Sequence, residues 1–141
     1  SILARASSTD LGGKGANQAL VLSRAGVAVT LAAAIGRDPR GEEIRARLVA
    51  EGLAEALIEV PAPTDASLIV TSEEGENTVV TTHAAADAMT PEAALTVLVG
   101  SAAGDLLVVQ GNLTEATTRS VLAVARARGI ATAFNPSPLR P

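Results

Sequence analysis

The sequence predicts an α/β fold in which a mainly parallel sheet is covered by helices and carries an appended β-hairpin. Amphipathic helical patterns alternate along the chain with short apolar runs, as they do in right-handed βαβ crossovers. Two adjacent stretches rich in Val and Thr interrupt this alternation and indicate the hairpin. A chain of 141 residues is long enough to form one domain with a substantial core.

The N-terminal part is predicted to contain two helices with a strand between them. Small residues on one face favour a helix over residues 14–25, and a continuous apolar run over residues 27–35 is typical of a strand buried on both faces. Residues 40–51 are predicted to form the second helix, where Glu43 and Arg47 have the favourable i,i+4 order. A glycine follows each helix and provides a stop.

The middle of the chain is predicted to form a β layer that is appended to the sheet. Residues 66–71 and 78–82 are β-prone, and the loop between them contains Gly and Asn, which indicates a hairpin. Leu57 to Val60 is a further candidate strand, and the start of the chain is strand-like as well. We therefore expect strands of this layer at about residues 1–8 and 57–83.

The C-terminal part returns to the α/β pattern. Thr90 is the expected N-cap of a helix with Pro91 at its first position. Residues 106–110 and 130–134 are apolar runs typical of buried strands. Residues 114–128 between them are predicted to form a helix that is capped by Thr114 and ended by Gly129.

Composition excludes several classes of function. A net charge of −4 and a sequence pI of about 4.9 disfavour a nucleic-acid partner, and Phe134 is the only aromatic residue available for stacking on bases. The lack of cysteine excludes disulfides and thiolate zinc sites. No apolar run approaches the roughly 18 residues of a membrane span, and no signal peptide is recognisable. We therefore expect a cytoplasmic protein without a membrane partner.

The run from Gly12 to Ala19 is the strongest candidate for a binding site. Its glycines allow a sharp turn and a close approach of a ligand, and the helix that follows offers free N–H groups. Lys14 adds a cation, and Asn17 adds an amide that can donate and accept. The run is not a P-loop, because no Ser or Thr follows Lys14, and no glycine lies three residues beyond Gly15 to complete a dinucleotide fingerprint. A plain connecting turn is the alternative interpretation.

Polar residues follow two of the predicted strands. Gln110-Gly111-Asn112 follows one strand and Asn135-Pro136 follows another. The carboxyl ends of parallel strands meet at one edge of a sheet, where open α/β folds bind ligands. Amides in such places can also be simple turn residues, so their convergence with the glycine-rich turn is what points to a ligand.

The single histidine and the central acidic cluster predict neither catalysis nor metal binding. No Ser or Cys nucleophile accompanies His83, which we expect to be a surface or packed polar residue. The spacing of Glu73, Glu74 and Glu76 fits no calcium loop, so we expect a solvated hairpin tip.

Four ordered segments resemble the ribokinase-like (PfkB) sugar kinases, and within that family they are most similar to ribokinases. The segments are Gly12–Ala19 with Gly26 and Gly36–Gly41, then Glu74–Asn77, Gln110, and Asn135–Pro138. The resemblance covers nearly the whole chain and implies a three-layer, Rossmann-like fold in which the strands at about residues 1–8 and 57–83 form a lid. It also implies that residues 1–141 are a partial domain, the N-terminal portion of such a kinase, without its ATP-binding half.

The resemblance implies a role for individual residues. Gly13, Lys14 and Asn17 inherit contacts to sugar hydroxyls, and Lys14 also lies near the phosphoryl group during transfer. Asn112 occupies a position where ribokinases usually have a sugar-contacting Glu, so ribose itself is left open. Ala85-Ala86-Asp87 stands where many ribokinases have Gly-Ala-Asn.

The implied chemistry is transfer of the ATP γ-phosphoryl group to a sugar hydroxymethyl group, with Mg²⁺ and a monovalent cation as candidate cofactors. The family's carboxylate and anion hole belong to a Gly-Ala-Gly-Asp motif that this chain lacks, and Gly104-Asp105 stands before a strand, in the wrong context. The resemblance therefore predicts part of a sugar site, no catalytic or metal-binding residue, and no activity of these residues alone.

Two other functions remain open from the sequence. A nucleoside kinase of the same family is the alternative among enzymes, and a non-catalytic sugar-binding or sensor protein is the alternative outside them.

A two-stranded hairpin is marginal alone in water, and ribokinases are known to pair through their lids. The resemblance therefore also predicts a homodimer through residues 57–83, which holds each lid over the turn from Gly13 to Asn17.

Overall fold

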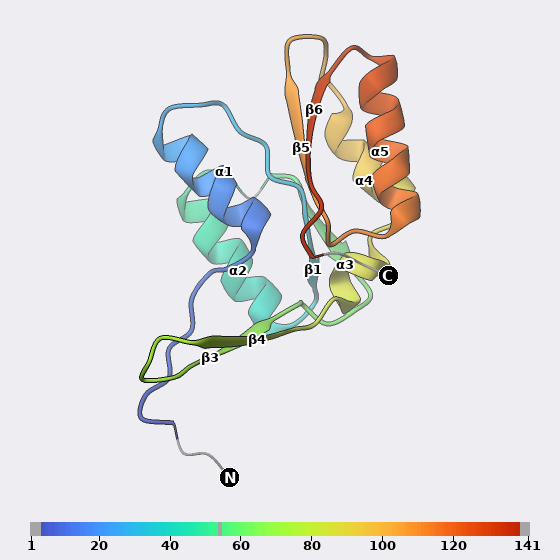
Figure 1. Ribbon diagram of the computed structural model, residues 1–141. Helices are drawn as coiled ribbons and strands as arrows, with labels where there is room; N and C mark the ends of the chain where they lie inside the picture. Colours follow the sequence, from blue (N-terminus) through green and yellow to red (C-terminus); the bar gives the residue numbers. More distant parts are fainter. Residues whose placement is uncertain (1–3, 54, 139–141) are drawn as a thin grey trace.

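The computed structural model describes residues 4–53 and 55–138 (Figure 1). Helices and parallel strands alternate on both sides of a central hairpin, which confirms the predicted α/β class. In chain order the elements are α1 (Lys14–Arg24), β1 (Ala33–Gly36), α2 (Pro39–Ala50), β2 (Leu57–Val60), β3 (Ser67–Thr71), β4 (Asn77–Thr81), α3 (Ala84–Ala88), α4 (Pro91–Leu95), η1 (Thr96–Leu98), β5 (Leu106–Gln110), α5 (Glu115–Ala127) and β6 (Ala131–Asn135).

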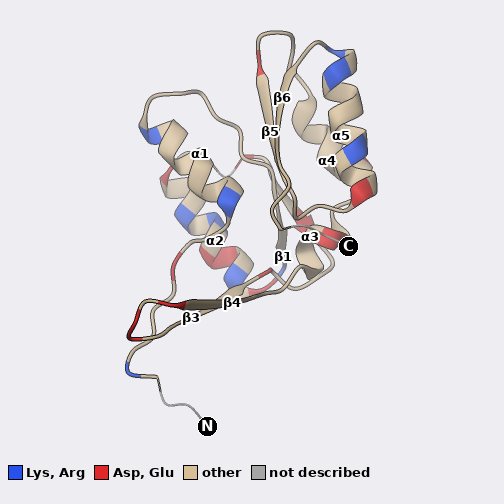
Figure 2. Cartoon of the chain, viewed as in Figure 1, with Lys and Arg blue, Asp and Glu red and all other residues tan. Residues whose placement is uncertain are grey.

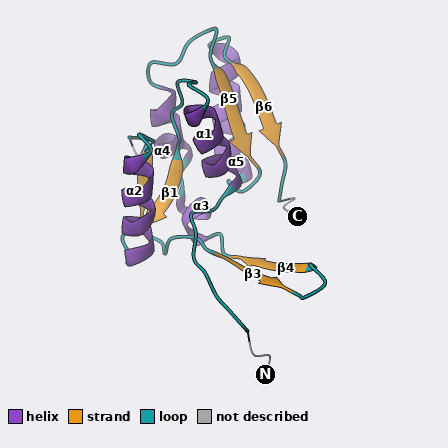
Figure 3. Ribbon diagram, turned by 90° about the vertical axis from the view of Figure 1, so that its left-hand side faces the viewer, coloured by secondary structure: helices purple, strands orange, loops and turns teal. Residues whose placement is uncertain are grey.

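The parallel strands form two pairs. β1 pairs with β2 from Ala33–Leu57 to Gly36–Val60, and β5 pairs with β6 from Leu106–Ala131 to Gln110–Asn135. Among the described residues no ladder joins the two pairs. The arrows of β1, β5 and β6 in Figure 3 point toward the same end of the molecule, so their carboxyl ends meet there.

Helices cover both faces of the parallel strands, which gives three layers (Figure 1). Ala34 and Ile58 pack toward a cluster of Met89, Ala94, Leu98, Val109 and Val121, beside α4 and α5. Leu57, which neighbours Ile58 on β2, packs instead toward a cluster of Ala19, Leu31, Leu48 and Leu53, beside α1 and α2. Because successive strand residues point to opposite faces, β2 contributes to both hydrophobic clusters.

Helix ends follow local signals in the sequence. Asp38, Thr90 and Thr114 are N-caps whose side chains accept backbone N–H hydrogen bonds in the first turns of α2, α4 and α5. Gly26 and Gly129 have positive φ angles of 82° and 70° after α1 and α5, where a side chain would be strained.

The prediction of a strand over residues 27–35 is wrong in its extent. Only Ala33–Gly36 forms a ladder, and Val27 is 50% exposed in an irregular segment. Within the described chain β1 pairs with the four residues of β2, and the ladder between them begins at Ala33. Apolar composition alone therefore did not identify where strand pairing begins.

The antiparallel hairpin of β3 and β4 is confirmed, but the predicted lid was too wide. β2 pairs in parallel with β1 and so belongs to the sheet rather than to the lid. Residues 4–8 form no strand, and residues 1–3 of the expected first lid strand lie outside the described residues. The part of the predicted lid that forms a separate β layer is therefore the pair β3–β4, every residue of which is exposed, and we use the name lid for this pair.

The hairpin tip lies beside the N-terminal segment. Arg5 forms an ion pair with Glu73 at 2.5 Å, and Figure 2 shows the acidic residues on this turn next to a basic residue of the segment. Glu73, Glu74 and Glu76 are all exposed, as predicted for a solvated tip. No helix among the described residues is long and apolar enough to cross a membrane.

Candidate functional site

The glycine-rich turn leads directly into α1. Gly13 is the N-cap residue with a φ of 99°, and no side chain caps this helix end. A Cβ at Gly13 would meet nothing within 4 Å, so the backbone angle rather than crowding explains this glycine. Lys14 and Asn17 are both exposed on the first turn of α1. The uncapped N–H groups and these two side chains together present a polar, cationic surface.

The structure brings the end of β5 next to α1. The side-chain Nε2 of Gln110 donates to Oε1 of Gln18 at 2.7 Å, across 92 positions of sequence. The Nδ2 of Asn135, at the end of β6, donates to Oε1 of Gln110 at 3.1 Å. Three amides from α1, β5 and β6 therefore form one hydrogen-bonded chain, which we call the amide chain.

The turn after β5 is held tightly against the turn after β6. A Cβ on Gly111 would lie 2.6 Å from the carbonyl carbon of Pro136 and 2.9 Å from the backbone nitrogen of Ser137. Only glycine fits there without displacing the backbone. Asn112 follows this glycine and is exposed. The carboxyl ends of β5 and β6 thus form one rigid edge next to the start of α1.

A second polar cluster lies where β1 ends and α2 begins. The carboxylate of Asp38 accepts from the backbone nitrogens of Gly41 and Thr64 at 2.8 and 2.7 Å and from the Thr64 hydroxyl at 2.7 Å. The Thr64 hydroxyl in turn accepts from the buried N–H of Gly36 at 2.8 Å. These hydrogen bonds, first those from the Thr64 and Gly41 backbones, hold the pKa of Asp38 below its ordinary value.

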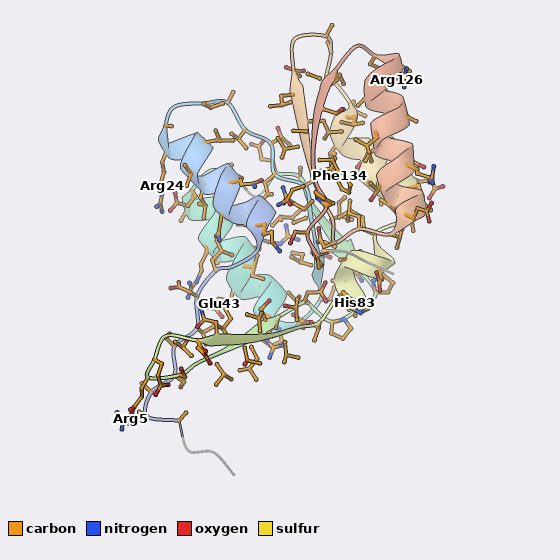
Figure 4. The ribbon with its side chains drawn as sticks, in the orientation of Figure 1. Arg5, Arg24, Glu43, His83, Arg126 and Phe134 are labelled. Carbon is orange, nitrogen blue, oxygen red and sulfur yellow. The ribbon has the colours of Figure 1, made fainter. Side chains whose placement is uncertain are left out.

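The base of the lid is anchored by Asp65. Its carboxylate accepts from the backbone nitrogens of Ala85 and Ala86 at 3.3 and 2.9 Å, in the first turn of α3. The hydroxyl of Thr82 also donates to it at 3.2 Å, which links the two ends of the hairpin. His83 lies at this base in Figure 4 and contacts Asp87 at 2.6 Å. His83 therefore contacts a carboxylate and not a Ser or Cys nucleophile.

Two cavities among the described residues lie away from the glycine-rich turn. One, of about 290 Å³, is lined by residues that include Gly36, Arg45 and Glu59 between β1, α2 and β2. Its charges are balanced, because Arg37 and Arg45 both bind Glu59, at 3.1 and 2.8 Å, and Glu42 lines the cavity as well. Gly13, Lys14, Asn17 and Asn112 belong instead to an open surface at the carboxyl edge.

Comparison with known proteins gives the family of this chain. The model of the pfkB family of carbohydrate kinases matches residues 1–140. The chain belongs to the PfkB family. It is 32% identical over 131 residues to a ribokinase of Bacillus subtilis (strain 168), covering 92% of this chain and 45% of that protein.

Solved PfkB structures share the fold. The ribokinase of Giardia lamblia matches 92% of this chain and 42% of its own with a TM-score of 0.79 at 26% identity. The ribokinase of Thermotoga maritima matches the same shares with a TM-score of 0.77 at 25% identity. The chain therefore spans less than half the length of these relatives, and the ribokinase-like fold class is confirmed.

Sequence reasoning missed three residues around the site. Gln18 was missed because the sequence around it does not distinguish it from a solvent-exposed residue of a helix. Asp38 accepts hydrogen bonds from Thr64, which is far away in sequence. Asp65 accepts its hydrogen bonds from residues on the other side of the hairpin. The available signal for Asp38 was its place directly before Pro39, an arrangement typical of a helix N-cap.

Proposed function

We propose that the protein containing this chain is an ATP-dependent kinase that phosphorylates the hydroxymethyl group of a ribose-like pentose or a related carbohydrate. The main support is the convergence of the glycine-rich turn with the ends of β5 and β6, in a chain that matches the PfkB family over nearly its whole length. The similarity to a protein named ribokinase supports a sugar as the substrate class.

In this proposal the exposed groups of the edge bind the sugar. The turn from Gly13 to Asn17 contacts hydroxyl groups through backbone N–H groups and the Asn17 amide. Lys14 lies near the phosphoryl group as it is transferred. Asn112 is an amide that both donates and accepts, so it pairs with a hydroxyl without adding negative charge. That difference from a carboxylate is the reason to test sugars beyond ribose.

ATP, Mg²⁺ and the candidate monovalent cation are proposed to bind mainly outside this chain. The described residues contain no group of three or more His, Cys, Asp or Glu side chains placed to hold a metal ion, so they do not fit a metal site by themselves. The family's carboxylate and anion hole belong to a motif that this chain lacks, so we assign no catalytic residue to this chain beyond the Lys14 contact and propose that residues 1–141 alone are inactive. A homodimer through the lid is part of the same proposal.

The direct test is a substrate panel on the full-length protein with ATP and Mg²⁺, read out as ADP release. We expect a pentose or a related sugar to be phosphorylated, and a Lys14→Met variant to lose most of the rate. Phosphorylation of nucleosides with no turnover of free sugars would instead establish the nucleoside-kinase alternative. Folded protein that phosphorylates neither class, yet binds a sugar in calorimetry, would establish the sensor alternative.

The inactivity of the isolated residues is tested separately. We expect no ADP release from purified residues 1–141 with the sugar that the full-length protein prefers. Turnover by this chain, prepared from a host that lacks sugar kinases, would contradict the assignment of the catalytic groups to the remainder of the protein.

A further inference from the structure

The amide chain links the two segments that are proposed to contact the sugar, and it joins both to the end of β6. Gln18 follows Asn17 directly on α1, Gln110 precedes Asn112 by two positions, and Asn135 ends β6. Gln110 is central, because it donates to Gln18 at 2.7 Å and accepts from Asn135 at 3.1 Å. The other two members each contribute one hydrogen bond to this chain.

The surroundings of Gln110 leave its side chain little freedom. A Cβ on Gly15 would lie 3.6 Å from the Cγ of Gln110, so the first turn of α1 packs closely on the side chain. On the other side, the turn after β6 closes on Gly111. The half-buried amide therefore lies between α1 and β6, in contact with both.

We propose that Gln110 is a positioning residue that sets the separation between the turn from Gly13 to Asn17 and Asn112. The inference rests on the proposed sugar-kinase function and deepens it, because it identifies what aligns the two sugar-contacting segments. A neutral amide suits this position, since it offers an N–H donor on one side and a carbonyl acceptor on the other. A leucine has a similar size but neither group.

This alignment affects the sugar more than the nucleotide. The segments that Gln110 joins are those proposed to contact sugar hydroxyls, and small misplacements of such groups weaken binding and slow transfer. Two hydrogen bonds of ordinary strength correspond to about a tenfold effect or somewhat more. We therefore expect Gln110→Leu to raise the KM for the preferred sugar about tenfold, with the KM for ATP unchanged.

A double-mutant cycle distinguishes positioning from general damage. Because Gln110 acts on α1 through Gln18, the Gln18→Leu/Gln110→Leu double variant is expected to be no worse than Gln110→Leu alone. Arg119→Met serves as the control, since it removes an exposed side-chain hydrogen bond of 2.7 Å to Glu115 on α5. That variant is expected to keep both KM values of the wild type.

Hydrogen exchange provides a readout that does not depend on turnover. In the full-length Gln110→Leu variant, amides of residues 13–24 are expected to exchange faster, while those of α5 are unchanged. An unchanged exchange rate in α1, additive effects in the cycle, or equal rises of both KM values would each overturn the proposal. If the wild type phosphorylates no sugar, the proposed function fails, and exchange in α1 still decides whether Gln110 positions that helix.

Discussion

Asp38 forms both a local helix cap and hydrogen bonds to a segment that is distant in sequence. It caps α2 through Gly41, and the same carboxylate holds Thr64, whose hydroxyl satisfies the buried N–H of Gly36. Gly36 and Gly41 are both required, because a Cβ on Gly41 would lie 2.2 Å from the Gly36 carbonyl oxygen and a Cβ on Gly36 would lie 2.3 Å from the Ala62 carbonyl oxygen. One carboxylate thereby joins β1, α2 and the segment that leads to the lid.

The lowered pKa of Asp38 predicts a specific pH dependence of stability. The ionised form is favoured in the folded state, so its contribution is complete above the ordinary aspartate pKa of about 3.9 and is lost as pH falls through the lower folded value. We expect the difference in thermal midpoint between wild type and Asp38→Asn to be constant from about pH 5 to 7 and to shrink below about pH 4. A difference that grows on acidification would contradict this prediction.

Asn112 is the residue on which sugar preference is expected to depend. Replacement with Glu puts a charged acceptor beside the turn from Gly13 to Asn17, and hydrogen bonds to charged groups are stronger than neutral ones. We expect Asn112→Glu to raise kcat/KM for ribose, relative to the sugar that the wild type prefers, by about tenfold. Competition assays with the two sugars measure the ratio directly, and an unchanged ratio would remove Asn112 from the sugar site.

At the scale of elements, the hairpin is attached to the rest of the chain through its base. Asp65 caps α3 and binds Thr82, while its neighbour Thr64 is held by Asp38. The strands themselves are exposed on both faces. Thr64 and Asp65, which precede the lid, therefore form hydrogen bonds with different parts of the chain. Thr64 is bonded to Asp38 at the end of β1, and Asp65 is bonded to α3.

Loss of the Asp65 carboxylate is expected to loosen the lid. Asp65→Ala leaves the N–H groups of Ala85 and Ala86, in the first turn of α3, without this acceptor and breaks the link to Thr82. We expect faster hydrogen exchange over residues 67–71 and 84–88. Asp105→Ala is the matched control, because its carboxylate accepts one backbone N–H, from Ala102 at 2.9 Å, at a distant turn. Equal changes at the lid in both variants would show that Asp65 has no special role.

At the scale of the whole molecule, the two faces of the lid differ in character. Leu68 is paired with Val80 and shares its face with Val70, and all three are more than half exposed, at 66%, 62% and 51%. The opposite face carries Ile69 and Val79 between polar residues, including a Ser67–Thr81 hydroxyl contact of 2.9 Å. The first face is the better candidate for burial against a second lid.

The proposed dimer can be tested one face at a time. We expect wild-type full-length protein to elute as a dimer in light-scattering chromatography, and Leu68→Asp/Val80→Asp to give monomers with weakened sugar binding, because buried carboxylates oppose association. Ile69→Asp/Val79→Asp is the matched control on the other face and is expected to remain dimeric. A monomeric wild type, or dissociation by the second pair alone, would contradict the proposed interface.

The sequence by itself determined most of the local structure. Caps at Thr90 and Thr114 and stops at Gly26 and Gly129 were predicted correctly, because they depend on interactions within one turn of helix. The Val- and Thr-rich hairpin was predicted for the same reason, since its strands are neighbours along the chain. The resemblance of the glycine-rich turn and strand-end motifs indicated the family correctly.

Only the tertiary structure decided which segments pair. Leu57–Val60 is as β-prone as the lid strands, yet it pairs with β1, and residues 27–32 remain irregular although they are apolar. The amide chain through Gln18, Gln110 and Asn135 joins residues far apart in sequence. The physical reason is that strand pairing and side-chain hydrogen bonds depend on which segments meet in space, whereas periodicity and capping depend on the nearest few residues.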